Sequence, residues 1–332
     1  MTTTIMAREA ASTPQVIAKQ LQSNQAQCER LGEEIRKFNP AFVYIIGRGS
    51  SDHAGVFGKY LIETELGVPV CAAAPSVTGL FGKKLKLSNA LVLCISQSGR
   101  SPDILTQAKA ARESGAICVA LVNDTSSPLA ELADVVLPLQ AGEEKAVAAT
   151  KSYLATLSAL LQLVAHWAQN EEFQQALTKL PEQLQQAVEA PAQLTQEFIS
   201  PLRHCVVLGR SFGYAISREI ALKLKEVCGI QAESFSSAEF LHGPVTLVAN
   251  KLGVIDIDLN DESAKAHRDQ IREIASRGAI LSQICPVGTD LHPRTAPLTV
   301  LQRFYLDIEN IAVAMGRDPD SPVGLNKVTQ TV

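Results

Sequence analysis

Residues 41–66, AFVYIIGRGSSDHAGVFGKYLIETEL, decide how the chain can fold. Residues 41–46 form a short apolar run rich in β-formers, the turn GRGSS follows at 47–51, and residues 54–66 have helical character. A short apolar strand that passes through a glycine turn into a helix is the first half of a βαβ unit. The stretch therefore predicts one strand of a parallel sheet.

The same alternation continues through the first half of the chain. We expect strands at 68–73, 90–95, 116–122 and 135–139, and helices at 13–37, 102–114 and 153–169. Strands that alternate with helices imply a parallel sheet that helices cover on both faces. The first half is therefore predicted to be a doubly wound α/β domain.

The second half repeats the order of the first. Residues 205–208 are apolar and lead into GRSFG at 209–213, and a helix follows, as it does after GRGSS. Further strands are expected at 231–235, 252–257 and 279–284, with helices at 261–277 and 298–315. Because strand, glycine, arginine and helix recur in one order, we interpret the chain as an internal duplication of a doubly wound domain.

The length also favours two domains, since 332 residues exceed what one hydrophobic core usually holds. We place a helical N-terminal segment at 1–36, the first domain at 37–170, a helical connector at 171–200, and the second domain with a C-terminal tail at 201–332. The connector is rich in glutamine, yet the recurring Leu177, Leu180 and Leu184 favour helix over disorder.

The composition excludes several classes of partner. A net charge of −4 provides no basic surface for nucleic acid or an anionic membrane, and no apolar run approaches the length that spans a bilayer. The seven cysteines are scattered, without a CxxC pair or a Cys/His cluster, so we expect reduced thiols rather than disulfides or a zinc site. With no secretory leader at the N-terminus, we expect a cytoplasmic protein.

Groups that can transfer protons are concentrated in residues 219–244, EIALKLKEVCGIQAESFSSAEFLHGP. Glu219, Lys223 and Glu226 share a helical stripe beside an apolar one, so Lys223 and Glu226 should meet at the edge of the core. A partly desolvated carboxylate beside an ammonium can serve as a general base. The alternative is a solvated helical face with ordinary ion pairs, and a His242 that only caps a turn.

The turn SQSGRS at 96–101 is a candidate phosphate site. It leaves the carboxyl end of an expected strand and enters a helix, which is where open α/β sheets bind ligands. Backbone N–H groups at the helix start and the hydroxyls of Ser96, Ser98 and Ser101 suit a phosphate, and Gly99 lets the backbone approach it. The glycine spacing of a nucleophile elbow or of a dinucleotide turn is missing, which leaves a plain serine-rich turn as the alternative.

Six blocks of sequence in register resemble the sugar isomerase (SIS) family, in particular the isomerase half of glucosamine-6-phosphate synthase and stand-alone aminosugar-phosphate deaminases. The blocks are GRGSS, SQSGRSPD, EEKAVAATKS, EIALKLKE, AEFLHGP and SPVGLNKV. The resemblance covers nearly the whole chain. It implies two tandem doubly wound, flavodoxin-like parallel-sheet SIS domains with a helical N-terminus and connector. It also implies a homodimer with shared active sites, in which the other subunit often contributes the histidine.

The resemblance assigns the substrate-binding residues block by block. Side chains of two turns would bind the phosphate group of the sugar phosphate. They are the side chains of Ser51, Ser96, Gln97, Ser98 and Ser101. Ala148 and Ala149 would line the sugar through their backbone. Ala149 stands where the synthase tends to carry serine, so one hydroxyl is missing from the sugar site.

The catalytic residues follow from the same resemblance. Glu226 would be the base between C1 and C2, with Lys223 as its neighbour on the helix. His242 would open the sugar ring, and Lys327 would reach the substrate carbonyl from the tail. The tail reads PVGLNKVT at 322–329, against PRNLAKSVTVE in the synthase, and keeps the lysine. No glutaminase sequence precedes the first helix, so we expect no ammonia to be made from glutamine.

Together these roles imply hydrolytic deamination of glucosamine 6-phosphate to fructose 6-phosphate and ammonia, without a metal or a cofactor. A fructosamine-6-phosphate deglycase, a galactosamine-6-phosphate deaminase, and an aldose–ketose isomerase that keeps its nitrogen would use the same base. A sugar-phosphate sensor without turnover is the alternative of another class. The joint retention of Glu226, His242 and Lys327 argues against a sensor.

Overall fold

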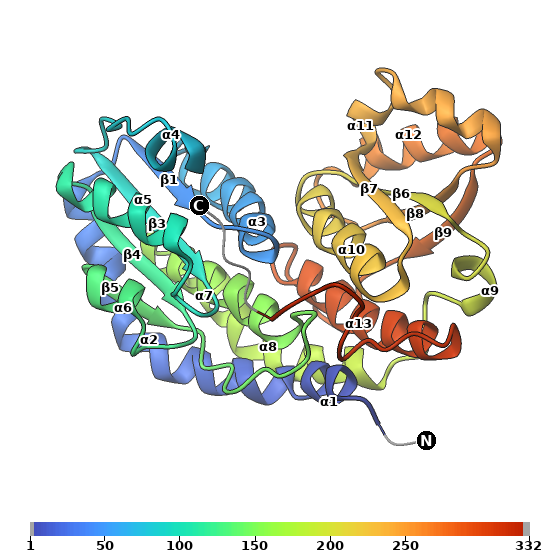
Figure 1. Ribbon diagram of the computed structural model, residues 1–332, viewed down its shortest axis with the longest axis horizontal. Helices are drawn as coiled ribbons and strands as arrows, with labels where there is room; N and C mark the ends of the chain where they lie inside the picture. Colours follow the sequence, from blue (N-terminus) through green and yellow to red (C-terminus); the bar gives the residue numbers. More distant parts are fainter. Residues whose placement is uncertain (1–2, 328–332) are drawn as a thin grey trace. The chain divides into compact units, whose positions relative to one another are not determined.

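The structure is a computed structural model that describes residues 3–327 (Figure 1). Contacts within the chain divide it into two units. The N-terminal unit comprises Gln15–Glu144 and Lys151–Lys179. The C-terminal unit comprises the described residues up to Pro14, together with Lys145–Thr150 and Leu180–Lys327.

The N-terminal unit is built on a sheet of five parallel strands in the order β2-β1-β3-β4-β5. The strands are β1 (Phe42–Ile46), β2 (Val70–Ala72), β3 (Ala90–Ser96), β4 (Ile117–Val122) and β5 (Val135–Pro138). Every residue of β3 is buried, as expected for a central strand covered on both faces. The chain winds outward in both directions from β1 and β3, which confirms the flavodoxin-like fold.

Helices cover both faces of this sheet. On one face, α5 (Pro102–Glu113) packs against β3 and β4, with α4 (Pro75–Gly79) and α6 (Pro128–Leu132) beside it. On the other face lie α3 (Ser50–Leu66) and α7 (Lys151–Trp167), and α2 (Thr13–Phe38) packs on α7. Alternate strand residues divide between the faces, so Tyr44 joins the core under α5 while Ile45 meets Gly58 of α3.

The C-terminal unit repeats this plan with one strand fewer. Its four parallel strands lie in the order β7-β6-β8-β9 and are β6 (His204–Gly209), β7 (Gln231–Ser236), β8 (Gly253–Ile257) and β9 (Ile280–Ile284). One helical layer pairs α10 (Phe212–Cys228) with α13 (Ala296–Ala314). A second core joins β6 and β8 to α11 (Ser237–Phe240), η1 (Pro244–Asn250) and α12 (Ala264–Ser276).

The turns after β1 and β6 show the duplication at the level of single residues. A Cβ added at Gly47 would lie 2.8 Å from the backbone of Ser51, and one at Gly209 would lie 2.2 Å from the backbone of Gly213. Two residues after each of these glycines the backbone has the same unusual conformation. Gly49 has φ 52° and ψ −127°, and Ser211 has φ 51° and ψ −120°. Serine rarely adopts this conformation, so the second copy holds Ser211 under strain.

The two units divide the chain differently from the predicted boundaries. Helix α1 (Ile5–Ala11), which lies within the predicted helical segment at 1–36, packs on α13, where Gln302 Nε2 donates to the carbonyl of Ala10 at 2.9 Å. The predicted connector consists largely of α8 (Glu171–Glu189), which begins in the N-terminal unit and ends in the C-terminal unit, followed by the short α9 (Gln196–Ile199). In the part of the chain that the structure describes, no helix is both long enough and apolar enough to cross a membrane.

Candidate active site

The predicted phosphate residues lie in two adjacent turns of the N-terminal unit. Strands β1 and β3 are paired in parallel with Ile46 opposite Cys94, so the turns that follow them start side by side at the carboxyl edge of the sheet. Ser51 lies in the first turn of α3, and Ser101 is the N-cap of α5. The point between β1 and β3 is where the chain reverses its winding direction, which is the ligand position of open α/β sheets.

The turn at 96–101 is held in one shape by its own hydrogen bonds. The N–H of Gly99 donates to Ser96 Oγ at 3.1 Å, which leaves the Ser96 hydroxyl proton available to a ligand. Gly99 has φ 63°, and a Cβ added there would lie 2.1 Å from Ser127 Oγ, so only glycine fits this position. The Ser101 hydroxyl makes no cap bond to its own helix. Gln97 and Ser98 are half-buried in the same turn.

The equivalent edge of the C-terminal unit has the opposite character. The segment after β8 reads DLNDES at 258–263 and carries three carboxylates. Arg268 donates to Asp258 at 2.6 and 3.1 Å, and Arg294 donates to Glu262 at 3.0 and 2.8 Å. An edge whose acids hold its arginines does not attract a phosphate, so of the two equivalent edges only that of the N-terminal unit has the groups that suit an anion.

The C-terminal unit instead holds a buried lysine between two carboxylates on α10. Lys223 Nζ lies 2.5 Å from Glu226 Oε2 and 3.2 Å from Glu219 Oε1. The side chain of Lys223 is 1% exposed, that of Glu219 is 0% exposed and that of Glu226 is 20% exposed. The predicted contact between Lys223 and Glu226 is therefore confirmed. Of the two carboxylates, Glu226 is the one that solvent can reach.

The charges of this trio determine its protonation. Burial by itself would lower the pKa of Lys223, but the neighbouring Glu219 and Glu226 carboxylates outweigh burial and raise the pKa above its ordinary value. Lys223 therefore remains an ammonium at neutral pH. The ammonium, at 2.5 Å, also orients the Glu226 carboxylate.

The predicted sugar-lining loop and the tail lysine lie together in the C-terminal unit. Lys327 Nζ donates to the carbonyl of Ala146 at 2.5 Å, and the N–H of Val147 donates to the carbonyl of Asp320 at 3.0 Å. Ala148 is buried and Ala149 is half-buried in the same loop. Val328 and Thr329, which end the predicted tail block, lie outside the described residues.

Two acidic side chains tie this loop and tail to helix α1. The carboxylate of Glu9 accepts from the N–H groups of Lys145 and Ala146 at 2.6 and 3.2 Å. The carboxylate of Asp320 accepts from the first N–H groups of α1, those of Ile5 and Met6, at 2.8 and 2.7 Å. Sequence reasoning missed these contacts because their partners are more than a hundred residues apart in the chain.

His242 lies apart from the lysine and its carboxylates. It follows α11 in a turn, and Gly243, with φ 154°, leads from this turn into η1. Its backbone N–H donates to Glu239 at 3.0 Å, and its side chain is exposed. Within residues 3–327, neither a hydrogen bond nor an ion pair joins His242 to Glu226. One chain therefore does not bring these two predicted catalytic groups into contact.

A second histidine, with no sequence signal of its own, supports the segment that leads to His242. His267 Nε2 lies 2.7 Å from Asp256 Oδ1, and its Nδ1 lies 2.9 Å from Ser237 Oγ. These three side chains are fully buried, so they cannot reach a substrate as a nucleophilic triad would. The contacts instead fix the first residue of α11 to α12 and β8.

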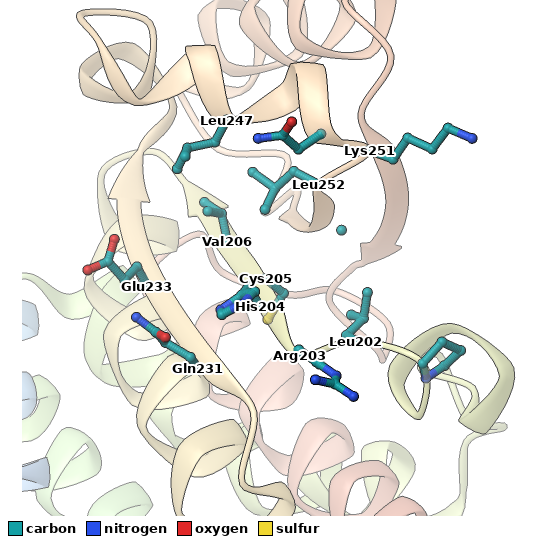
Figure 2. Close-up of a pocket in the computed structure, with 13 residues that line it drawn as sticks. Leu202, Arg203, His204, Cys205, Val206, Gln231, Glu233, Leu247, Lys251 and Leu252 are labelled. Carbon is teal, nitrogen blue, oxygen red and sulfur yellow. The ribbon is translucent and has the colours of Figure 1, made fainter.

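One cavity of the C-terminal unit lies away from all predicted site residues. This cavity, of about 550 Å³, opens at the amino ends of β6, β7 and β8. Figure 2 shows Leu247 and Leu252 near Val206, and Lys251 pointing away from them. Ligands of parallel α/β sheets bind at the carboxyl ends, so this cavity does not change the assignment of the site.

No metal site is evident in the described part of the chain, where no three His, Cys, Asp or Glu side chains are grouped to hold an ion. The polar groups of the predicted site residues are hydroxyls, backbone N–H groups, carboxylates and amines. Those groups suit anion binding at one edge and proton transfer at Glu226.

Comparison with known proteins identifies relatives over most of the chain. The family model of the SIS domain matches residues 39–166 and 198–296. The chain is 30% identical over 311 residues to the isomerizing glutamine–fructose-6-phosphate aminotransferase of Shewanella oneidensis, a match that covers 86% of this chain and 51% of that protein. The chain thus spans about half the length of such relatives.

Solved structures match over the full length of their chains. A candidate phosphosugar isomerase from Silicibacter pomeroyi DSS-3 is 36% identical, with a TM-score of 0.88, over 96% of this chain and 100% of its own. The glucosamine-6-phosphate deaminase of Thermotoga maritima is 22% identical, with a TM-score of 0.77, over 99% of this chain and 100% of its own. The latter likeness is one of fold.

We expect Lys223→Met to destabilise the protein strongly, because it leaves two carboxylates at the core without their cation. Breaking a buried ion pair typically costs about 3–5 kcal/mol. The matched control is Lys59→Met, since Lys59 pairs with Glu63 at the same i,i+4 spacing as Lys223 with Glu219 but is 44% exposed. Exposed pairs contribute at most about 1 kcal/mol. Urea denaturation of both variants measures the difference.

The contribution of Lys223 to the free energy of unfolding depends on pH because folding raises the pKa of Lys223. A raised pKa at Lys223 means that the stabilisation is complete below its ordinary value of 10.5 and is lost only as the pH rises through the raised pKa. Equal unfolding midpoints for the two variants at pH 7 would contradict the assignment of Lys223 as the charge that holds the two carboxylates.

Proposed function

The chain belongs to the SIS domain family, and from that premise we propose that it is an enzyme of the phosphosugar isomerase class. The proposed reaction is hydrolytic deamination of glucosamine 6-phosphate, which gives fructose 6-phosphate and ammonia. The observation that carries the proposal is Glu226, a partly exposed carboxylate held at 2.5 Å by a buried ammonium. A base of this kind suits removal of a proton next to a carbonyl.

Binding begins with the phosphate of the substrate in the turns at 47–51 and 96–101. Hydroxyls and helix-start N–H groups there would accept the anion without a metal. The phosphate would hold C6 of the sugar, and the backbone of Ala148 and Ala149 would line its other end. Positioning by a remote phosphate leaves the reacting carbons to be aligned with the base.

Proton transfer then converts the aldose to a ketimine. His242 assists ring opening, which frees the C1 aldehyde. Glu226 removes the C2 proton and returns it to C1, while a proton passes from the amine to O1. Water adds to the resulting C2 imine and expels ammonia, so the products are the ketose phosphate and one ammonia for each water consumed. Lys327 is proposed to stabilise the negative charge that develops on O1.

The proposed reaction predicts ammonia release that matches ketose formation mole for mole. We would assay the purified protein with glucosamine 6-phosphate, galactosamine 6-phosphate, a fructosamine 6-phosphate and glucose 6-phosphate. Glucosamine 6-phosphate should be the substrate that liberates ammonia. Interconversion of glucose 6-phosphate with its ketose, and no ammonia from any amino sugar, would replace the deaminase assignment with an isomerase that keeps its substrate's nitrogen.

We further propose that the working form is a homodimer in which Glu226 of one subunit acts with the histidine of the other. The proposal is supported by the exposed side chain of His242 and by its separation from Glu226 within one chain. A shared site would bring the exposed imidazole to a substrate bound at the partner, which one chain alone does not do.

Mixing two inactive variants tests the shared site. Glu226→Gln and His242→Asn subunits, co-expressed in equal amounts, should form mixed dimers with one intact site each. Random pairing in a two-fold dimer then restores about one quarter of the wild-type activity. No recovery of activity in mixed dimers, verified by tagging each variant differently, would show that each site draws both groups from one chain.

A further inference from the structure

We propose that Arg48 binds the phosphate group directly and supplies the cation of the phosphate site. The inference rests on the proposed function, which places a sugar phosphate at the turns of the N-terminal unit. The resemblance stated above assigns that site hydroxyls and an amide but no positive charge. A phosphate dianion in such a site gains most from a guanidinium, whose fork donates two parallel hydrogen bonds.

The strand register puts Arg48 beside the phosphate turn. Ile46 of β1 is paired with Cys94 of β3. Two positions beyond this pair, β1 leads to Arg48 and β3 reaches Ser96. Both therefore stand at the carboxyl edge of the sheet, on adjacent strands. Gly49, which follows Arg48, has φ 52° and is the N-cap of α3, so Arg48 lies in the short turn between β1 and this helix.

A buried carboxylate fixes the guanidinium from one side. Arg48 Nε donates to Asp103 Oδ2 at 2.5 Å, and the side chain of Asp103 is 2% exposed. Asp103 lies in the first turn of α5, immediately after Ser101 and Pro102, and its Oδ1 accepts from the N–H of Ile104 at 2.9 Å. The anchor thus belongs to the helix that the phosphate turn enters.

The other side of the guanidinium remains available. The side chain of Arg48 is 49% exposed, and within residues 3–327 its two terminal NH₂ groups have no hydrogen-bond partner. Because Nε is held by Asp103, the planar group is oriented before a ligand arrives, and little side-chain freedom is lost on binding. An anchored, half-exposed guanidinium at the edge of a hydroxyl-lined turn is suited to a phosphate.

Arg100, the other arginine of these turns, has a different arrangement. Its Nη2 donates to Asp124 Oδ2 at 2.8 Å, and the two side chains are 53% and 37% exposed. Hydrogen bonds from the Ser126 hydroxyl and from Arg100 lower the pKa of Asp124 to about 2, so Asp124 stays ionised and keeps Arg100 engaged. Arg100 is therefore the matched control, an arginine of similar exposure whose guanidinium pairs with Asp124.

The test measures binding of fructose 6-phosphate and of inorganic phosphate to the full-length protein by isothermal titration calorimetry. Arg48→Gln should weaken both affinities by roughly ten-fold or more, because it removes a charge-assisted contact. Arg100→Gln should change them by less than about three-fold, as expected for loss of an exposed ion pair. Raising the salt concentration should weaken wild-type binding more than binding by Arg48→Gln.

Arg48→Lys provides a second test of Arg48 if the Arg48→Gln variant fails to fold. It keeps the charge and the pairing with Asp103 but loses the fork, so it should still weaken binding several-fold. Wild-type affinity in a folded Arg48→Gln or Arg48→Lys protein would overturn the role of Arg48 and leave the proposed function standing. If the wild-type protein binds neither fructose 6-phosphate nor phosphate, the proposed function itself fails, and the inference fails with it.

Discussion

The site depends on one electrostatic constraint, the burial of an ammonium on α10. Lys223 is 1% exposed, and a charge so far from water is tolerated because Glu219 and Glu226 surround it at 3.2 and 2.5 Å. Glu219 is fully buried and accepts at 3.5 Å from the Tyr305 hydroxyl of α13, so it belongs to the core. Glu226, at 20% exposure, lies at the boundary between core and solvent. The buried ammonium therefore fixes the position of a carboxylate that is partly open to solvent.

Duplication supplied two sheets of the same winding, and the chain has made their edges chemically different. The edge of the N-terminal unit carries hydroxyls, Gly99 at a position that no other residue fits, and Arg48, which is paired with Asp103. The corresponding edge of the C-terminal unit carries carboxylates already paired with arginines. Because phosphate recognition needs donors and positive charge, we propose the phosphate site for the N-terminal unit, whereas the proposed base Glu226 belongs to the C-terminal unit.

Local sequence patterns predicted what depends on local geometry. The strands, the main helices, the repeated glycine turn and the meeting of Lys223 with Glu226 all follow from spacings of a few residues. Contacts between distant segments left no such pattern. Arg48 and Asp103 are 55 residues apart, and His267 meets Ser237 across 30 residues. The N-terminal segment was predicted to be helical, but the contacts of the short helix α1 with α13 and the tail, which stabilise it, left no pattern in the sequence.

The central claim is that Glu226 is the base that moves the C2 proton. NMR in deuterated water measures this step directly, as exchange of the C2 hydrogen of a bound sugar phosphate with solvent. The account predicts that the wild-type protein incorporates deuterium at C2, whereas Glu226→Gln binds the sugar phosphate and exchanges at least about a hundred-fold more slowly. Exchange by Glu226→Gln at the wild-type rate would contradict the account.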